Sequence, residues 1–111
     1  MTAMTIDAAT FAELQATTGA DFVVELVDTF AEEAPQMLAE IRAAHATADA
    51  ERFRRASHSL KSNSNTFGAV RLAEMARTLE LGGLPADAGP LDAVAIELEA
   101  AVVALKSLAR A

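Results

Sequence analysis

Hydrophobic and polar residues alternate along this chain with the three-to-four-residue period of an amphipathic α-helix, and no segment has the pattern of a β-strand. The first predicted helix is short and covers about residues 8–17. Thr5 or Asp7 can serve as its N-cap, and Gly19 lies where the helix should end.

A second, much longer helix is predicted from about residue 21 to residue 46. Pro35 lies inside it and should kink or briefly break it, because proline removes a backbone donor and clashes with the preceding turn. The apolar positions expected to face the core recur at threes and fours: Phe22, Leu26, Phe30, Met37 or Leu38, and Ile41.

Three further helices are predicted in the rest of the chain. One runs from its cap at Asp49 to Phe67, where Gly68 can supply the turn. The next follows almost immediately and stops at the glycine pair 82–83, and the last follows a loop that contains Pro85, Gly89 and Pro90. The apolar faces of these last two helices are Leu72, Met75 or Ala76, and Leu79, and then Leu91, Val94, Leu98, Val102, Leu105 and Leu108.

Four substantial amphipathic helices with short connections predict an all-α fold, an up-and-down antiparallel four-helix bundle with the short additional N-terminal helix capping one end. A length of 111 residues suits a single domain over residues 1–111. Sustained heptads with charged flanks are absent, which disfavours an extended coiled coil, and we expect a monomer.

Composition narrows the chemistry and the location. The chain has no cysteine, which excludes a disulfide, a thiolate nucleophile and a cysteine-ligated zinc, and suits a cytoplasmic protein. No run reaches the roughly 18 apolar residues needed to cross a bilayer, and the N-terminus lacks the basic residues of a signal peptide. We therefore expect a soluble protein with no membrane partner.

Charge is distributed unevenly. The formal net charge is −7, yet residues 52–79 hold six basic residues against Glu74 alone, a local +5 that leaves −12 for the rest. Repulsion from the acidic remainder opposes nucleic-acid binding, and no tyrosine or tryptophan interleaves the basic residues to stack on bases. The pattern favours a compact anionic partner, such as an acidic pocket on another protein.

The candidate chemistry lies in residues 56–69, which read A-S-H-S-L-K-S-N-S-N-T-F-G-A. On a helix, His58 points roughly 160° away from the apolar stripe, so it should face water. The cations and polar groups within one or two turns of it would favour a bound phosphate, which makes His58 a candidate phosphoacceptor. These neighbours are Arg54, Arg55, Lys61, Ser62 and Asn65, with Lys61 the strongest candidate contact.

Two other residues in these helices are assigned structural roles. Ser64 falls within the apolar stripe formed by Phe53, Ala56, Leu60 and Phe67, and we expect it to serve close helix packing with its hydroxyl bonded back to a carbonyl. His45 lies at the edge of the stripe of the second helix, where a half-buried structural role is expected.

The segment resembles the histidine-containing phosphotransfer (HPt) family, whose pattern is approximately A-H-x-L-K-G-S-S-x-x-x-G-A on a helix. Helix order and length are similar over nearly the whole chain, and Leu72 and Leu79-Glu80 also lie where the family tends to place them. Ser62 departs from the family's usual glycine, although it is still small. The match falls on His58, Leu60, Lys61, Ser64, Gly68 and Ala69.

The resemblance implies that His58 accepts a phosphoryl group from a receiver-domain aspartate of a response regulator, or from a hybrid sensor histidine kinase, and relays it to another receiver aspartate. In such a relay the partner supplies the aspartate and Mg²⁺. The chain itself would need no cofactor and no metal, and would be a phosphocarrier rather than an enzyme.

Three alternatives compete with this interpretation. A binding-only helical adaptor would keep the bundle and dock receiver domains without carrying phosphate. A dimeric sensor-kinase helix pair is disfavoured because Ser59, directly after the histidine, is not acidic. A metalloenzyme is disfavoured because His45 and His58 lie thirteen residues apart, so one helix face cannot gather both as ligands.

Overall fold

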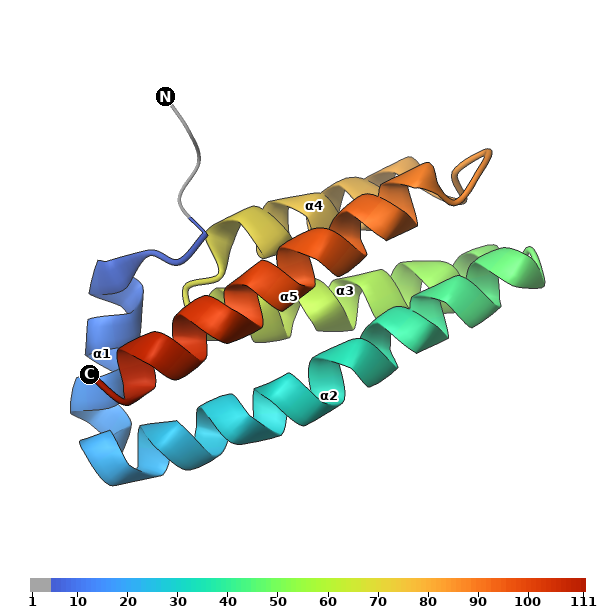
Figure 1. The fold of residues 1–111 in the computed structure, drawn as a ribbon. Coiled ribbons are helices and arrows are strands. Elements are labelled where there is room, and N and C mark those ends of the chain that lie inside the picture. Colours follow the sequence, from blue (N-terminus) through green and yellow to red (C-terminus); the bar gives the residue numbers. More distant parts are fainter. Residues whose placement is uncertain (1–4) are drawn as a thin grey trace.

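The computed structural model describes residues 5–111, and within that range it contains five α-helices and no strand. Helices α2 to α5 lie side by side as an antiparallel four-helix bundle, and α1 lies across one end (Figure 1). The predicted fold class is therefore confirmed. The helices are α1 (Ala8–Thr18), α2 (Ala20–Ala46), α3 (Ala50–Thr66), α4 (Val70–Gly82) and α5 (Gly89–Ala109).

The order of the helices around the bundle determines which faces stay open. Helix α3 packs most extensively against α4 and then against α2, while α5 packs mainly against α2 and less against α4. Helices α3 and α5 are therefore diagonal partners whose outward faces point in opposite directions. None of the helices in residues 5–111 combines the length and the apolar character that a bilayer crossing requires.

The predicted caps begin the helices as expected. Asp7 is the N-cap of α1 and accepts a hydrogen bond from the Ala9 amide at 3.3 Å, and Asp49 caps α3 through the Arg52 amide at 3.1 Å. Gly68 makes the turn between α3 and α4 with a φ of +77°. Its carbonyl also accepts a 2.7 Å hydrogen bond from the Asp7 amide, which ties α1 to this turn.

The apolar stripe of α2 differs from the predicted one in its first half. Val23 and Val27 are buried, whereas Phe22 is 50% exposed, so the predicted core role of Phe22 was wrong. Leu26 is half-buried and packs against the core, so its predicted orientation is confirmed. Apolar residues occur side by side here, and periodicity alone could not choose between neighbouring registers. In the observed register the small side chain of Ala34 lies in the core. The buried row is Val23, Val27, Phe30, Ala34, Leu38, Ile41 and Ala44.

Helix α2 is continuous through Pro35, so the predicted brief break was wrong, while the predicted kink stays a prediction. The proline lies on the exposed side of the helix and deprives only the Ala31 carbonyl of its usual donor. Packing of the buried row against α3 and α5 on both sides of this point holds the helix together.

Ser64 is fully buried in α3 as predicted, and Ser57 is buried with it. Neither hydroxyl has a hydrogen-bond partner within residues 5–111, so the expected bond from Ser64 back to a carbonyl was wrong. Small size, rather than hydrogen bonding, is what suits these serines to the core. His45 is half-buried, with its Nε2 at 2.9 Å from the Pro85 carbonyl, which confirms its structural role beside the loop between α4 and α5.

Candidate functional site

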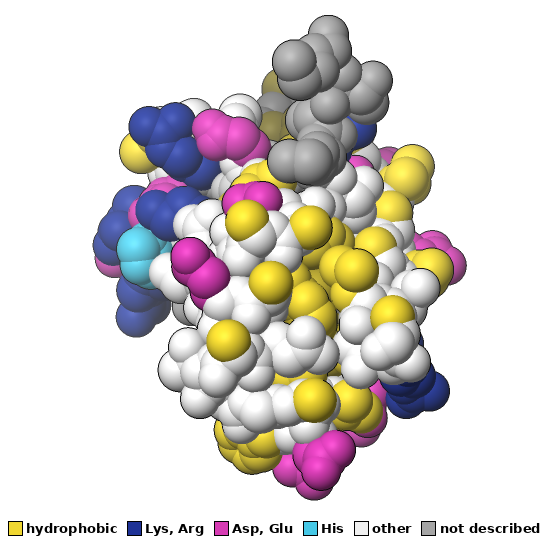
Figure 2. Space-filling view, turned by 90° about the vertical axis from the view of Figure 1, so that its left-hand side faces the viewer, with side chains coloured by type: hydrophobic (Ala, Val, Ile, Leu, Met, Phe, Trp, Pro, Cys, Tyr) yellow, Lys and Arg dark blue, Asp and Glu magenta, His cyan; other side chains and the backbone are white. Residues whose placement is uncertain are grey.

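His58 lies in the middle of α3 on the face turned away from the core. Its side chain is 54% exposed, while Leu60 on the same helix is completely buried, so the predicted outward orientation is confirmed. On one side of the molecule a histidine side chain lies among lysine and arginine side chains, with acidic side chains between them (Figure 2). The ring is therefore open to a partner that approaches a basic surface.

The imidazole is held from one side by a carboxylate of the neighbouring helix. His58 Nδ1 lies 2.7 Å from Oε2 of Glu80 in α4, and Lys61 Nζ lies 2.7 Å from Oε1 of the same carboxylate. The Glu80 side chain is only 11% exposed, so it lies in the seam between α3 and α4. One carboxylate thus bridges the histidine and the lysine.

The charge on this carboxylate decides the tautomer of the ring. Lys61, and after it His58, hold the pKa of Glu80 below its usual value of 4.5, so Glu80 is ionised at neutral pH. An ionised carboxylate can only accept hydrogen bonds, which makes Nδ1 the protonated nitrogen of a neutral His58. The lone pair then lies on Nε2, the nitrogen that Glu80 does not contact.

The arginines before His58 differ in how firmly they are held. Arg54 donates to both oxygens of Glu51, at 2.7 and 3.3 Å, whereas Arg55 Nε approaches Glu51 only to 3.9 Å. The Arg55 side chain is also 69% exposed. Of these two cations, Arg55 is the more available to a partner.

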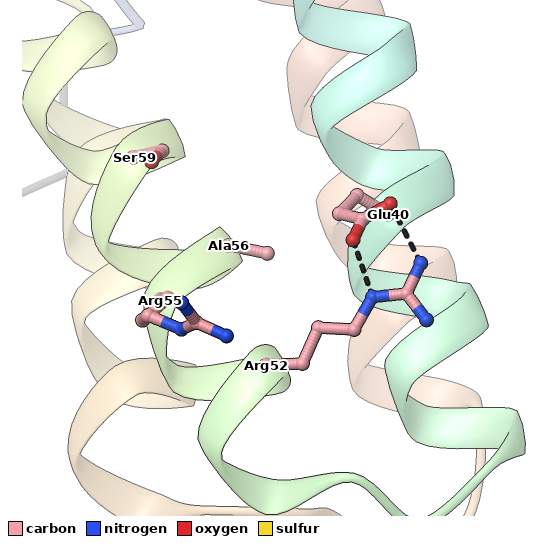
Figure 3. Close-up of a pocket in the computed structure, with 5 residues that line it drawn as sticks. All are labelled: Glu40, Arg52, Arg55, Ala56 and Ser59. Atoms are coloured by element: carbon pink, nitrogen blue, oxygen red, sulfur yellow. Dashed lines mark hydrogen bonds and ion pairs between the residues drawn. The ribbon is translucent and has the colours of Figure 1, made fainter.

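Arg52 closes the other side of this surface by pairing with Glu40 of α2 through two hydrogen bonds, one of them 2.9 Å from Nη2 to Oε2 (Figure 3). The hollow in Figure 3 has a volume of about 340 Å³ and lies next to a second one of about 370 Å³ that His58 and Glu80 line. Arg55 and Ser59 line both hollows. A shallow polar surface therefore crosses α3 from Glu40 to Glu80.

The structure brings together only some of the predicted site residues. Lys61 reaches the site indirectly, because its ammonium group contacts Glu80 and its side chain is only 24% exposed. Ser62 and Asn65 lie exposed on α3, and neither is in hydrogen-bond contact with His58. Their predicted contacts to a phosphoryl group or a partner stay predictions.

Glu80, which the structure places against His58, is a site residue to which the sequence assigned no role. It lies 22 residues after His58. It also comes directly after the basic segment of residues 52–79, so its negative charge is not part of the local charge of +5. Only the antiparallel packing of α3 on α4 brings it to the ring. Within residues 5–111 no cluster of three or more histidine or acidic side chains could hold a metal ion.

Comparison with known proteins agrees with this geometry. The family model described as "Hpt domain" matches residues 25–107. Among solved structures, the crystal structure of histidine-containing phosphotransfer protein B (HptB) from Pseudomonas aeruginosa PAO1 is similar, with a TM-score of 0.76 and 28% identity over 98% of this chain and 94% of that chain. No curated protein sequence matches. Because the family model covers most of the residues that form the bundle, the chain belongs to the Hpt domain family.

Proposed function

We propose that this chain is a histidine phosphotransfer protein that accepts a phosphoryl group on Nε2 of His58 from a receiver-domain aspartate and relays it to another. Membership of the Hpt domain family supports a role in a phosphorelay. The observation that carries the assignment to this residue is the contact between His58 Nδ1 and Glu80, which leaves Nε2 unprotonated on an exposed surface.

The transfer step needs no proton acceptor on this chain. The Nε2 lone pair attacks the phosphorus of the partner's aspartyl phosphate, a P–N bond forms, and the P–O bond to the aspartate breaks. The aspartate leaves with the bonding electron pair as a carboxylate. Nδ1 keeps its proton throughout, so the phosphorylated ring carries a positive charge that faces the ionised Glu80.

Each remaining site residue has a place in this proposal. Lys61 keeps Glu80 ionised and lies one turn from His58, where it can also meet phosphoryl oxygens. Arg54, Arg55, Ser62 and Asn65 contact the partner or the phosphoryl group. Mg²⁺ comes with the receiver domain, and the chain acts as a phosphocarrier rather than as an enzyme.

The wider proposal has three further features, which concern the protein partners, nucleic acid and the location of the chain. Donors and acceptors are receiver domains of response regulators or of a hybrid sensor histidine kinase, and nucleic acid is not a partner. The chain works in the cytoplasm, which its lack of cysteine suits.

The test is incubation with a phosphorylated receiver domain and Mg²⁺, comparing the unmodified chain with His58→Gln. We expect an acid-labile, base-stable label on the unmodified chain and none on the variant, with equal helix content by circular dichroism. Label retained by His58→Gln would refute the site. Binding of receivers by a folded chain that never becomes labelled would instead support the binding-only adaptor.

A further inference from the structure

The His58 ring borders a polar hollow that has room for a phosphoryl group. The hollow has a volume of about 370 Å³, and its lining residues are Arg54, Arg55, His58, Ser59 and Glu80. Nδ1 of the ring contacts Glu80, and the two nitrogens of an imidazole point to different sides of the ring. Nε2 is therefore directed away from this carboxylate, and a group bound to Nε2 meets side chains of α3 instead.

Two of the three cations within one turn of His58 on α3 are already held by carboxylates. Lys61 Nζ lies 2.7 Å from Glu80, and the Lys61 side chain is only 24% exposed. Arg54 donates to both oxygens of Glu51, at 2.7 and 3.3 Å. Hydrogen bonds between two charged groups are the strong ones in proteins. Either cation would therefore lose a strongly held carboxylate by turning to a phosphoryl group.

Arg55 is the third of these cations, and its donors are the most available. Its Nε approaches Glu51 only to 3.9 Å, which is beyond hydrogen-bond reach, and its side chain is 69% exposed. It precedes His58 by three residues, so the two side chains are neighbours on the helix surface. The planar guanidinium presents its donors in a fork that matches phosphate oxygens. Arg55 would give up only a long ion pair by binding a phosphoryl group.

Ser59 adds a neutral donor on the same surface. It is exposed and lies one turn after Arg55 on α3 (Figure 3). Both residues line the hollow beside His58 and also the neighbouring one. A serine hydroxyl rotates to suit its partner, so it can donate to whichever phosphoryl oxygen is nearest. A cation and a hydroxyl thus lie together beside the space that Nε2 faces.

We propose that Arg55 and Ser59 hold the phosphoryl group on His58, with the guanidinium and the hydroxyl donating to its oxygens. The inference rests on the proposed function, because it concerns the phosphorylated form of the same ring. These hydrogen bonds exist only in the phosphorylated chain, so they stabilise it relative to the unphosphorylated one. Arg55 and Ser59 therefore shift the equilibrium of phosphoryl transfer toward His58.

The equilibrium constant of transfer between a receiver and His58 distinguishes this role from docking. A residue that only contacts the receiver changes the forward and reverse rates by the same factor, because neither separate protein contains that contact. A residue that holds the phosphoryl group in the separate chain changes the ratio of the two rates. Rapid quench measures the second-order rates in both directions in the presence of Mg²⁺, from the phosphorylated receiver and from the phosphorylated chain.

We expect Arg55→Ala and Ser59→Ala each to lower the ratio of forward to reverse rate roughly threefold, and the double variant roughly tenfold. Arg55→Lys keeps the charge without the fork of donors, and it should recover part of the loss. Ser107→Ala and Arg110→Ala are the matched controls. They remove an exposed hydroxyl and an exposed cation of α5, and the ratio should stay unchanged.

The outcomes separate this assignment from the proposed function. A labelled chain whose ratio is the same in Arg55→Ala and Ser59→Ala as in the unmodified protein would overturn the assignment alone, even if both rates fell. A change in only one variant would overturn the role of the other residue. No label on the unmodified chain would overturn the proposed function and this assignment with it. Circular dichroism of each variant shows that the bundle is folded.

Discussion

At the scale of single residues, the His58 ring has one nitrogen in contact with Glu80 and the other open to the surface. The glutamate orients the ring and keeps the proton on Nδ1, and in the proposed transfer it would face the positive charge that phosphorylation gives the ring. In that proposal Glu80 is a positioning residue, since it would act through the imidazole and not on the phosphoryl group.

Two substitutions of Glu80 distinguish its role in orienting the His58 ring from the role of its negative charge. Glu80→Ala should slow phosphoryl transfer to His58 roughly tenfold to a hundredfold, because the ring loses a hydrogen bond to a charged group. Glu80→Gln keeps an acceptor for Nδ1 and should retain more activity. Rapid-quench transfer from a phosphorylated receiver measures both rates, and equal rates for all three proteins would show that Glu80 has no part in the reaction.

The pH dependence of the site follows from Glu80. Its pKa in the folded chain is lowered from 4.5, first by Lys61 and then by His58, so its stabilising contribution is present above the unfolded pKa and disappears as the pH falls through the folded value. Lys61→Met should raise the midpoint at which the Glu80 carboxyl carbon titrates by NMR. An unchanged midpoint would mean that Lys61 does not control the carboxylate.

At the scale of helices, Gly68 in the turn after α3 has two structural roles. Gly68 has a φ of +77°, and a Cβ there would lie 2.9 Å from the Asp7 carbonyl oxygen and 3.0 Å from Thr10 Cβ. The same residue therefore permits the turn and the close approach of α1. This close approach helps to hold α1 across the end of the bundle (Figure 1), where Phe11 also packs into the core.

A pair of glycine variants measures these two contributions. Gly83 has the same φ of +77° with nothing within 4 Å of an added Cβ. Gly83 also has a ψ of −167°, in a region that essentially only glycine occupies, so Gly83→Ala should cost roughly 1–3 kcal/mol of unfolding free energy from backbone strain alone. Gly68→Ala adds the clash with α1 and should in addition reduce the protection of the α1 amides from hydrogen exchange, which Gly83→Ala should leave unchanged. Urea unfolding and hydrogen exchange measure the two effects, and unchanged protection of α1 in Gly68→Ala would show that the contact with α1 contributes nothing.

At the scale of the whole molecule, folding changes how the positive charge near His58 appears to a partner. Each of the six basic side chains of residues 52–79 has an acidic partner within 4 Å, and all of these partners except Glu74 come from outside the segment: Glu40, Glu51, Glu80 and Glu97. Most of the local charge seen in the sequence is therefore compensated. Arg55 is largely exposed and shares Glu51 with Arg54, so most of its positive charge stays uncompensated.

Association with a receiver should accordingly depend on Arg55 more than on total charge. Arg55→Ala should slow association roughly threefold at low salt and have less effect at high salt, because surface charge acts mainly on encounter. Arg110→Ala is the matched control, an exposed cation at the end of α5. Stopped-flow binding measures both, and equal effects would mean that only net charge matters.

The sequence alone determined the helical class, the order and approximate ends of the helices, and the outward orientation of His58, because these depend on local periodicity, capping residues and turns. Only the tertiary structure decided the register of α2 at Phe22 and Val23, the continuity through Pro35 and the unpaired hydroxyl of Ser64, because packing against neighbouring helices overrides local preference. The contact between His58 and Glu80 also had to come from the structure. It joins residues of two helices, and a spacing of 22 residues carries no signal until those helices pack side by side.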